Sequence, residues 1–540
     1  MSTAAPTTPA RDARASRWRR GHSGEFTPLA VLAALIGAAV ALPAVYLFIV
    51  VGGDWDVAVD AVWRERTLWL LVRSLGLAGA VAVGATALAV PLAWLTVRSD
   101  LPGRRVWAVL VLLPFVVPSY IGAYLLVSAL GPRGVIVREV LAPLGIDSIP
   151  SIYGFWGAAA VLTAFTYPLV LLPVRAALRR MDPSLEEAAR GMGAGQLRVA
   201  RTVVLPQLVP AIGAGALLAV LYAMSDFGAV SILRYDSFTR VIYQNYRLSF
   251  ERAGAAALGV VLILVMVILI VIEGRMRRRA GYHRNAPGVA KPAAPVPLGA
   301  WRYPAFAFCA AVVGLTLVLP LGVLVYWASR TAGTTVDWGE FGQAALNSIV
   351  TAALAAGIAL VAAVPIARLG ARYPGRASRG IEAAHHAGYA LPHLVVALAL
   401  VFLGIRLVPW AYQSLGMAVF ALVVIYVPLA IGALRASMLQ VSPSLEDAAR
   451  GMGRGSLGVL VTITAPLVRP GVFAAATLVY IGAIKELPAM LLLAPTGYDT
   501  LATMIWGETS RSVFEAAALP SLVLLAVSAP VLALLVGRER

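Results

Sequence analysis

The chain has 540 residues, of which 60% are hydrophobic and only 13% are charged, and its formal net charge is +18. Soluble domains carry about 25% charged residues, so this composition excludes an ordinary soluble domain and favours a membrane protein. Cys309 is the only cysteine, which excludes a disulfide within the chain.

The basic N-terminal tail, residues 1–27, precedes an apolar run that begins near Pro28. The run is longer than the apolar part of a secretion signal, and no convincing cleavage site follows it, so we predict a retained first span. Val106–Leu130 carries no charged side chain over 25 residues, enough to cross about 30 Å of hydrocarbon. Twelve spans are predicted, beginning near Pro28, Leu71, Val106, Ile152, Leu208, Gly254, Tyr303, Ile349, Ile381, Ser414, Val472 and Ser512.

The distribution of Lys and Arg predicts the orientation of these spans. Segments on the side of the N-terminus hold 31 basic residues, whereas segments on the opposite side hold 11. Because basic loops stay inside, we predict that both termini are cytoplasmic. The segment 274–302 is basic first and then rich in Pro and Ala, which is typical of a cytoplasmic linker. We interpret its RMRRR run as an anchor that touches anionic membrane lipid, in preference to a nucleic-acid site.

Two stretches of the chain are repeated with different offsets. RSLGLAGAVAVGATALAVPLA at Arg73 aligns with NSIVTAALAAGIALVAAVPIA 274 positions later, whereas SLEEAARGMG at Ser184 lies 260 positions before SLEDAARGMG. The first half therefore carries 14 extra residues, which we place in the outer loop Gly131–Ser151. We predict an all-α polytopic membrane protein of about 12 transmembrane helices in two parallel six-helix repeats, 28–273 and 303–540.

The repeated decapeptides carry helix start and stop signals. Asp182 and Ser442 are expected to be N-caps, with the prolines that follow them at the first helical position. Gly193 and Gly453 can end each short helix and permit a sharp reversal. Each copy is thus predicted to be a cytoplasmic helix–turn–helix. Capping alone does not explain why the decapeptide is repeated while the flanking spans differ, whereas a shared partner surface does.

The first copy, with Glu187-Ala188-Ala189, Gly193 and Leu205-Pro206, resembles the EAA loop of bacterial ABC importer permeases. The second copy departs from the pattern with Asp447 for Glu and Ala465 for Leu. The resemblance implies a type I ABC importer permease fold, in which the loops 181–210 and 441–470 each seat a short helix in a groove on an ATPase subunit. It implies these coupling residues: Glu186, Glu187, Ala188, Ala189, Arg190, Gly193, Glu446, Asp447, Ala448, Ala449, Arg450 and Gly453.

The chain lacks the signature of an ATPase of its own. A phosphate-binding loop needs Gly-x-x-x-x-Gly-Lys-Ser/Thr, yet the only lysines, Lys291 and Lys485, follow Ala290 and Ile484. We therefore expect no enzyme activity and no cofactor on this chain, and Mg-ATP on two copies of a partner ATPase. Two rivals stay open: a secondary transporter would need no docking loops, and a membrane enzyme would need a catalytic group that we do not see.

Two acidic residues fall at equivalent positions in the fifth span of each half. Asp226 and Glu486 are 260 positions apart, and a charge in hydrocarbon costs about 2.5–3.5 kcal/mol on insertion scales. They either line the translocation path or serve as structural caps and pairing groups. The candidate path residues are Asp226, Glu486, Tyr120, Tyr124 and His393, and no stable metal site is expected.

The flanking segments narrow the predicted cargo. GAIKELPAMLLLAPTGYDTLATMIWG, from Gly482, and SDFGAVSILRYDSFTRVIY, from Ser225, resemble the fused permeases of the ferric iron importer group. The resemblance implies iron(III) delivered by an extracytoplasmic binding protein to a permease in the bacterial inner membrane. Carboxylate and phenolate oxygens suit so hard a cation. Thiamine is the next candidate cargo, followed by another small organic molecule such as a polyamine.

Overall fold

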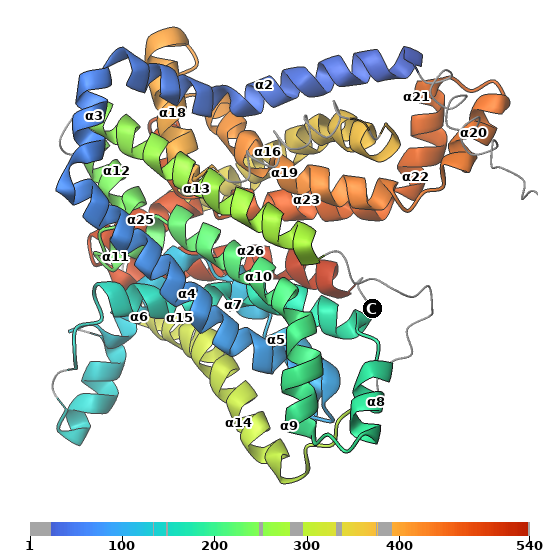
Figure 1. Ribbon diagram of the computed structural model, residues 1–540. Helices are drawn as coiled ribbons and strands as arrows, with labels where there is room; N and C mark the ends of the chain where they lie inside the picture. The colour runs from blue at the N-terminus through green and yellow to red at the C-terminus, as the bar shows by residue number, and fades with distance from the viewer. Residues whose placement is uncertain are drawn as a thin grey trace, which may run out of the picture. The chain divides into compact units, whose positions relative to one another are not determined.

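A computed structural model describes residues 23–132, 134–146, 149–247, 252–280, 295–330, 337–373, 375 and 391–537 (Figure 1). Within these ranges the regular elements are all helices, and the one extended contact is an isolated bridge between Ser99 and Val296. The predicted all-α class is confirmed. The basic tail up to residue 22 and linker residues 281–294 lie outside the described residues.

The twelve predicted spans correspond to three kinds of helix. Eight helices of the described chain are long and apolar enough to cross a membrane, or up to ten if each of two bent pairs is one span. Two shorter apolar helices complete the set, His393–Leu407 (α18) and the Phe514–Ser528 part of α26 (Phe514–Gly537). The predicted start at Ile381 lies outside the described residues. The long helices are α2 (Ser23–Gly53), α4 (Glu65–Arg98), α7 (Phe155–Arg180), α10 (Leu205–Ser225, continuing Ala200–Val204), α13 (Arg252–Ala280), α14 and α15 (Arg302–Val313 and Leu319–Arg330), α16 (Trp338–Arg372) and α19 (Leu415–Met438).

The third predicted span is not one straight helix. Arg104–Val116 and α6 (Ser119–Leu130) meet at an angle of 92°, so the expectation of an unbroken span over Val106–Leu130 is wrong. Pro118 accounts for the break, because proline lacks an N–H group and disfavours helical backbone in the preceding residue. Val117 accordingly has φ −72° and ψ 117°. A second bend, of 77°, separates Ser456–Leu467 from α23 (Arg469–Ile484).

The helix starts locate the extra residues of the first half. α6 and α18 begin at Ser119 and His393, 274 positions apart, whereas α7 and α19 begin at Phe155 and Leu415, 260 positions apart. The 14 additional residues therefore lie between α6 and α7, as predicted. This insertion holds the short helical turns Val137–Leu141 and Ala142–Leu144.

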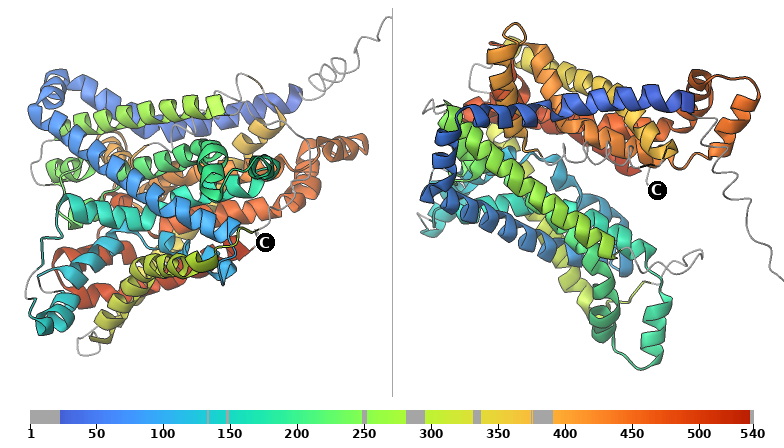
Figure 2. Two further views of the ribbon diagram at one scale, coloured as in Figure 1. Left: turned by 60° about the horizontal axis from the view of Figure 1, so that its bottom comes forward. Right: turned by 45° about the horizontal axis from the view of Figure 1, so that its top comes forward.

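The chain forms two compact units, and neither follows the sequence halves. The smaller unit comprises Met1–Pro43, Ala352–Tyr389 and Leu422–Ala483, and the larger one comprises Ala44–Thr351, Ala390–Ala421 and Ile484–Arg540. Within the larger unit, α4, α7 and α10 pack against one another, as the views of Figure 2 also show. This three-helix contact forms the core of the larger unit.

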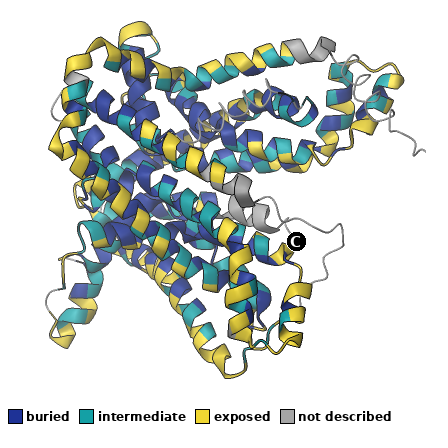
Figure 3. Cartoon of the chain, viewed as in Figure 1, coloured by how far each residue is buried: buried dark blue, intermediate teal, exposed yellow. Residues whose placement is uncertain are grey.

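Small residues allow these three helices to approach closely. Ala85 and Ala89 of α4 are fully buried, and a Cβ atom on Gly215 of α10 would lie 2.6 Å from the Cα atom of Val170 in α7. Small interface residues are typical of helices that pack in a membrane. The opposite face of α4 exposes large apolar side chains such as Val83, which is 71% exposed. Figure 3 shows exposed, intermediate and buried residues of the chain by colour. Apolar side chains on the outer surface suit contact with lipid and would be unusual in a soluble protein.

Candidate functional site

The two repeated polar loops fold into matching helix–turn–helix units. The first consists of α8 (Ser184–Gly191) and α9 (Gln196–Val199), and the second of α20 (Pro443–Gly451) and α21 (Ser456–Val459) (Figure 1). The predicted helix–turn–helix is therefore present in both copies. We call α8 and α20 the coupling helices.

The two coupling helices begin differently. The Ser184 N–H donates to Asp182 Oδ1 over 2.9 Å, and the hydrogen bonds from Ser184 lower the pKa of the Asp182 carboxyl. The N-cap of α8 is Pro183 and its first residue is Ser184, so the predicted N-cap at Asp182 is wrong. Asp182 precedes the N-cap and accepts the N–H group of the first helical residue. Ser442 and Pro443 occupy the predicted N-cap and first helical positions of α20, but the expected capping hydrogen bond from the Ser442 side chain is absent. Its hydroxyl instead lies 2.7 Å from the hydroxyl of Ser444.

Two residues after the end of each coupling helix stands a glycine with left-handed backbone angles. Gly193 and Gly453 have φ angles of 83° and 85°, a left-handed conformation that side chains disfavour. Their N–H groups each donate over 2.9 Å to a carbonyl three residues back. After α9 and α21 the chain makes one π-helical turn in each copy, η4 (Ala200–Val204) and η8 (Leu460–Thr464). The equivalence of the two loops thus extends well beyond the decapeptides.

The first coupling helix is held by a buried ion pair. Glu186 and Arg98, at the end of α4, are 6% and 5% exposed. The Arg98 Nη2 atom donates to Glu186 Oε1 over 2.8 Å, and the Arg190 Nη2 atom donates to Glu186 Oε2 over 3.2 Å. A buried carboxylate with two guanidinium partners fixes the coupling helix to the end of a membrane-spanning helix.

The second coupling helix has the same anchor with one more donor. Glu446 Oε1 accepts hydrogen bonds from Arg372 Nη2 at 2.8 Å, from Arg372 Nε at 3.1 Å and from the Thr464 hydroxyl at 3.0 Å. Burial raises the pKa of the Glu446 carboxyl, but Arg372 and Thr464 outweigh burial and the net shift is downward. The carboxylate is therefore held in its charged form.

Sequence reasoning missed both arginine anchors. Arg98 and Arg372 lie 274 positions apart, at the ends of α4 and α16, which is the offset of the second-span repeat. That shared offset was the signal from which the two arginine anchors could have been predicted. The structure places Glu186 and Glu446 on the inner face of each coupling helix, where each carboxylate pairs with a buried arginine. Leaving that arginine unpaired would cost free energy of folding.

The outer faces of the coupling helices carry exposed apolar side chains at equivalent positions. Leu185 and Met192 are 55% and 83% exposed, and Leu445 and Met452 are 49% and 73% exposed. These four side chains are suited to packing into a groove on a partner. Of the other predicted coupling residues, Glu187, Ala188, Arg190, Gly193, Ala448 and Gly453 are exposed, Ala189, Asp447 and Arg450 are half-buried, and Ala449 is buried.

Asp226 lies in a break between helices and not within a continuous span. It follows the last residue of α10 and precedes α11 (Gly228–Ile232). Its Oδ1 atom accepts the Ala229 N–H over 3.0 Å, and its Oδ2 atom accepts the Ser119 hydroxyl. The carboxyl group therefore joins the start of α11 to the start of α6.

Glu486 lies in the corresponding break, between α23 and α24 (Pro488–Leu493). Its Oε2 atom lies 2.8 Å from His393 Nδ1, at the start of α18. The neighbouring Lys485 places its Nζ atom 3.4 Å from the Phe115 carbonyl oxygen and over the Phe115 ring. Glu486 and His393, both predicted path residues, are thus in direct contact.

The two acids repeat one structural link. Ser119 and His393 lie 274 positions apart, and Asp226 and Glu486 lie 260 positions apart, the two offsets of the repeat. In each half a helix begins directly after the proline of the third span, at Ser119 or at His393. The acid that follows the fifth span bonds the first residue of that helix. The contacts show how both acids are held, and the choice between a path role and a structural role stays a prediction.

The two predicted path tyrosines are buried in different ways. The Tyr124 hydroxyl donates to the Phe514 carbonyl over 2.7 Å. Tyr120 is 4% exposed, and its hydroxyl has no hydrogen-bond partner among the described residues. Both tyrosine side chains are therefore packed into the protein core.

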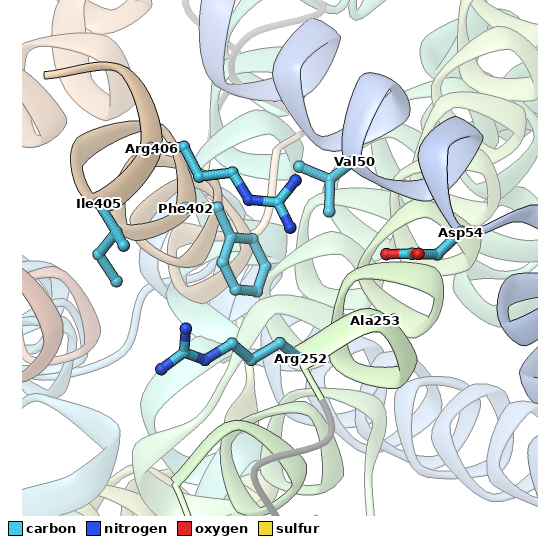
Figure 4. Close-up of a pocket in the computed structure, with 7 residues that line it drawn as sticks. All are labelled: Val50, Asp54, Arg252, Ala253, Phe402, Ile405 and Arg406. Atoms are coloured by element: carbon cyan, nitrogen blue, oxygen red, sulfur yellow. The ribbon is translucent and has the colours of Figure 1, made fainter.

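Two cavities among the described residues of the larger unit were not predicted from the sequence, and neither is lined by Tyr120 or Tyr124. The smaller, of about 60 Å³, has Arg252 and Arg406 on either side of the Phe402 ring (Figure 4). The larger, of about 460 Å³, is lined by three arginines together with aromatic, hydroxyl and amide side chains. Its volume is within the range of about 300–1,000 Å³ that is usual for small-molecule sites. We call it the arginine cavity.

Comparisons with known proteins identify similar chains. Residues 85–282 and 359–537 both match the family described as binding-protein-dependent transport system inner membrane component. The Fe(3+)-transport system permease protein FbpB 2 of Haemophilus influenzae is 31% identical over 93% of this chain and 96% of its own. The molybdenum transport system permease protein ModB of Escherichia coli is 33% identical over 41% of this chain and 98% of its own. The sulfate transport system permease protein CysT of Salmonella typhimurium is 29% identical over 35% of this chain and 69% of its own.

Proposed function

Since the chain belongs to the family of binding-protein-dependent transport system inner membrane components, we propose that it is the permease of an ABC importer for iron(III). The relative named for Fe(3+) transport covers both halves, whereas the relative named for molybdenum transport corresponds to 41% of this chain. In this proposal an extracytoplasmic binding protein delivers the cargo, and both termini lie in the cytoplasm. The excess of 31 basic loop residues over 11 supports that orientation.

The pair of coupling helices is the observation that carries the proposal. Each has an exposed Leu–Met pair on its outer face and a buried glutamate–arginine anchor on its inner face. A surface of this kind, present twice, is suited to two copies of one ATPase subunit. We propose that each ATPase seats one coupling helix and carries the bound Mg-ATP, and that this chain binds no cofactor.

The anchors provide a route from the ATPase to the membrane helices. Movement of α8 reaches the end of α4 through the Arg98–Glu186 pair, and movement of α20 reaches the end of α16 through Arg372–Glu446. The π-helical turns η4 and η8 lead from the coupling units toward the fifth spans. Binding of ATP and of the loaded binding protein then shifts the permease between inward-open and outward-open states, because each partner binds one state more tightly.

The docking surface is tested by placing charge on it. Met192→Glu and Met452→Glu, each alone and together, leave the buried anchors intact and place a carboxylate on the outer face of a coupling helix. We expect each single variant to reduce copurification of the ATPase and the double variant to abolish it. Leu144→Glu is the matched control, because Leu144 is 71% exposed and lies in the insertion between α6 and α7. Full ATPase recovery with the double variant would contradict the docking proposal.

The cargo is tested in vesicles that contain the permease, the ATPase and the binding protein. ATP-dependent accumulation of iron(III) is expected, with no accumulation of thiamine under the same conditions. Accumulation that persists after the ATPase is omitted would identify a secondary transporter. Accumulation of thiamine without iron would replace the proposed cargo while leaving the importer class in place.

A further inference from the structure

The arginine cavity lies at the opposite end of α10 from the first coupling helix. The chain runs from α8 through α9 and η4 into α10, whose 21 residues rise about 1.5 Å each and so cover about 31 Å. It then enters α11 and α12 (Phe238–Arg247), which contribute six of the fourteen residues that line the cavity. α25 (Leu501–Ser510) contributes Trp506, Thr509 and Ser510 to the wall. In the proposed orientation, this end faces the extracytoplasmic side, where cargo arrives.

One face of α12 is directed at the cavity. Arg240, Tyr243, Gln244 and Arg247 all line it, and their spacing of three, four and seven residues places them on one side of a helix. The opposite side of α12 is apolar, with Val241 and Ile242 buried. The polar face of α12 is therefore held toward the cavity by the burial of its apolar face.

Within the described residues, one of the three arginines of the cavity has a carboxylate partner and two have none. Arg240 is paired with Asp236 one helical turn earlier. Arg234 and Arg247 have no carboxylate within ion-pair distance among the described residues; they lie over the rings of Tyr153 and Tyr243, at 5.0 Å and 6.0 Å from the ring centroids. An aromatic ring orients a guanidinium through its face and leaves the N–H groups available to a ligand.

Neutral donors and a constrained backbone accompany the arginines. Ser231 is one of the lining residues, and its buried hydroxyl has no hydrogen-bond partner among the described residues. Arg234 and Ser512, which also line it, have φ angles of 55° and 62°. Such angles are uncommon for residues other than glycine and cluster at ligand sites. The cavity therefore presents N–H and O–H donors, with no acidic side chain among the residues that line it.

We propose that the arginine cavity is an oxyanion-binding site of the permease, with a tetrahedral anion such as phosphate as its simplest ligand. Guanidinium groups bind phosphate and carboxylate oxygens in a fixed, two-pronged geometry. A bare iron(III) ion is repelled by this wall, so cargo that passes the cavity carries its own anionic ligand. This inference rests on the proposed function, and it specifies the chemical form in which the metal crosses.

The site is tested by binding of radiolabelled inorganic phosphate to the assembled importer in lipid nanodiscs. Arg234→Gln together with Arg247→Gln removes the two guanidiniums for which the described part of the chain provides no carboxylate partner. We expect this variant to bind phosphate roughly tenfold more weakly, a change of about 1.4 kcal/mol. Arg511→Gln is the matched control, because Arg511 lies outside the cavity lining and pairs with Glu508 at 3.6 Å. The control should bind phosphate as the unchanged protein does, and ATPase copurification verifies that each variant is assembled.

A parallel uptake measurement distinguishes the sources of the anion. Entry of labelled phosphate together with iron(III), lost in the double variant, supports an anion that accompanies the metal. Entry of phosphate without iron supports the site but overturns the iron cargo of the proposed function. Equal phosphate binding by the unchanged protein and the double variant overturns the inference. So does a double variant that loses only the binding protein while it still binds phosphate, because the arginines would then serve protein docking.

Discussion

The two coupling helices are nearly identical in sequence, yet their buried glutamates are held differently. Glu186 divides its two oxygens between Arg98 and Arg190. Glu446 instead receives Arg372 and Thr464 on one oxygen, and Arg450 turns to Asp447, 3.2 Å away. The decapeptide alone therefore does not determine its own contacts.

A residue outside the decapeptide explains the difference. Thr464 donates a hydroxyl to Glu446, whereas the residue 260 positions earlier is Val204, which has no polar group to donate. In the first copy the arginine of the decapeptide, Arg190, supplies the second donor. In the second copy that role is filled, so the equivalent arginine pairs along its own helix. The two docking surfaces consequently differ in the pairing of their arginine, and a symmetric ATPase pair would meet two non-identical partners.

The largest expected effect is the loss of the second anchor. Glu446→Ala removes three hydrogen bonds and leaves Arg372 buried without its carboxylate, at a cost of about 3–5 kcal/mol in the free energy of unfolding. Glu186→Ala should cost less, because two hydrogen bonds are lost. Chemical denaturation of the purified protein in detergent measures both values.

Replacing both partners of the second anchor tests whether its charge pairing, and not the burial of its side chains alone, sets the stability. Arg372→Met with Glu446→Leu removes both charges and should be more stable than Glu446→Ala alone, since no unpaired charge stays buried. Equal stability of Glu446→Ala and the unchanged protein would contradict the anchor. In that case the contrast between the two coupling helices would carry no energetic weight.

Exchanging Thr464 and its counterpart Val204 should change the free energy of unfolding less than loss of the anchor does. Thr464→Val removes one hydrogen bond to a charged acceptor and should lower the free energy of unfolding by about 1.5–3 kcal/mol. Val204→Thr supplies a hydroxyl to Glu186 in competition with Arg190 and should raise it by only about 0.5 kcal/mol. Thermal and chemical unfolding of both variants measure the difference. Losses of the same size in both would show that the position acts through packing and not through its hydroxyl.

The fold was largely accessible from sequence because its signals are local. Apolar length indicates the spans, and the Asp182, Gly193 and Gly453 signals mark where α8 begins and where both coupling helices end, all within a few residues. The bend at Pro118 was missed because an uncharged run of 25 residues satisfied the length criterion on its own. The presence of a proline in such a run does not by itself show a break, whereas the backbone angles beside the proline do.

The candidate site was only partly accessible because its contacts are distant in the chain. Arg98 lies 88 residues from Glu186, and Arg372 lies 74 residues from Glu446. No local pattern shows which face of a coupling helix is buried. The sequence therefore did not show that the glutamates are buried while Met192 and its equivalent are exposed. The repeat offsets contained this information, because an arginine recurring at the second-span offset and a glutamate at the decapeptide offset are candidates for the same pair.

The smallest expected effect is a pH dependence that belongs to the second anchor. The folded-state pKa of Glu446 is lowered from its ordinary value, so in acid the unfolded chain takes up a proton before the folded one does. The stabilisation is therefore complete above the unfolded-state pKa and declines as the pH falls toward the folded-state pKa. The loss should be only a few tenths of a kcal/mol at about pH 5 and grow below it. Glu446→Gln should lack this component of the unfolding curve, and Thr464→Val should reduce it, because the hydroxyl helps to lower the pKa. A component of unchanged size in Glu446→Gln would assign the acid sensitivity to other carboxylates.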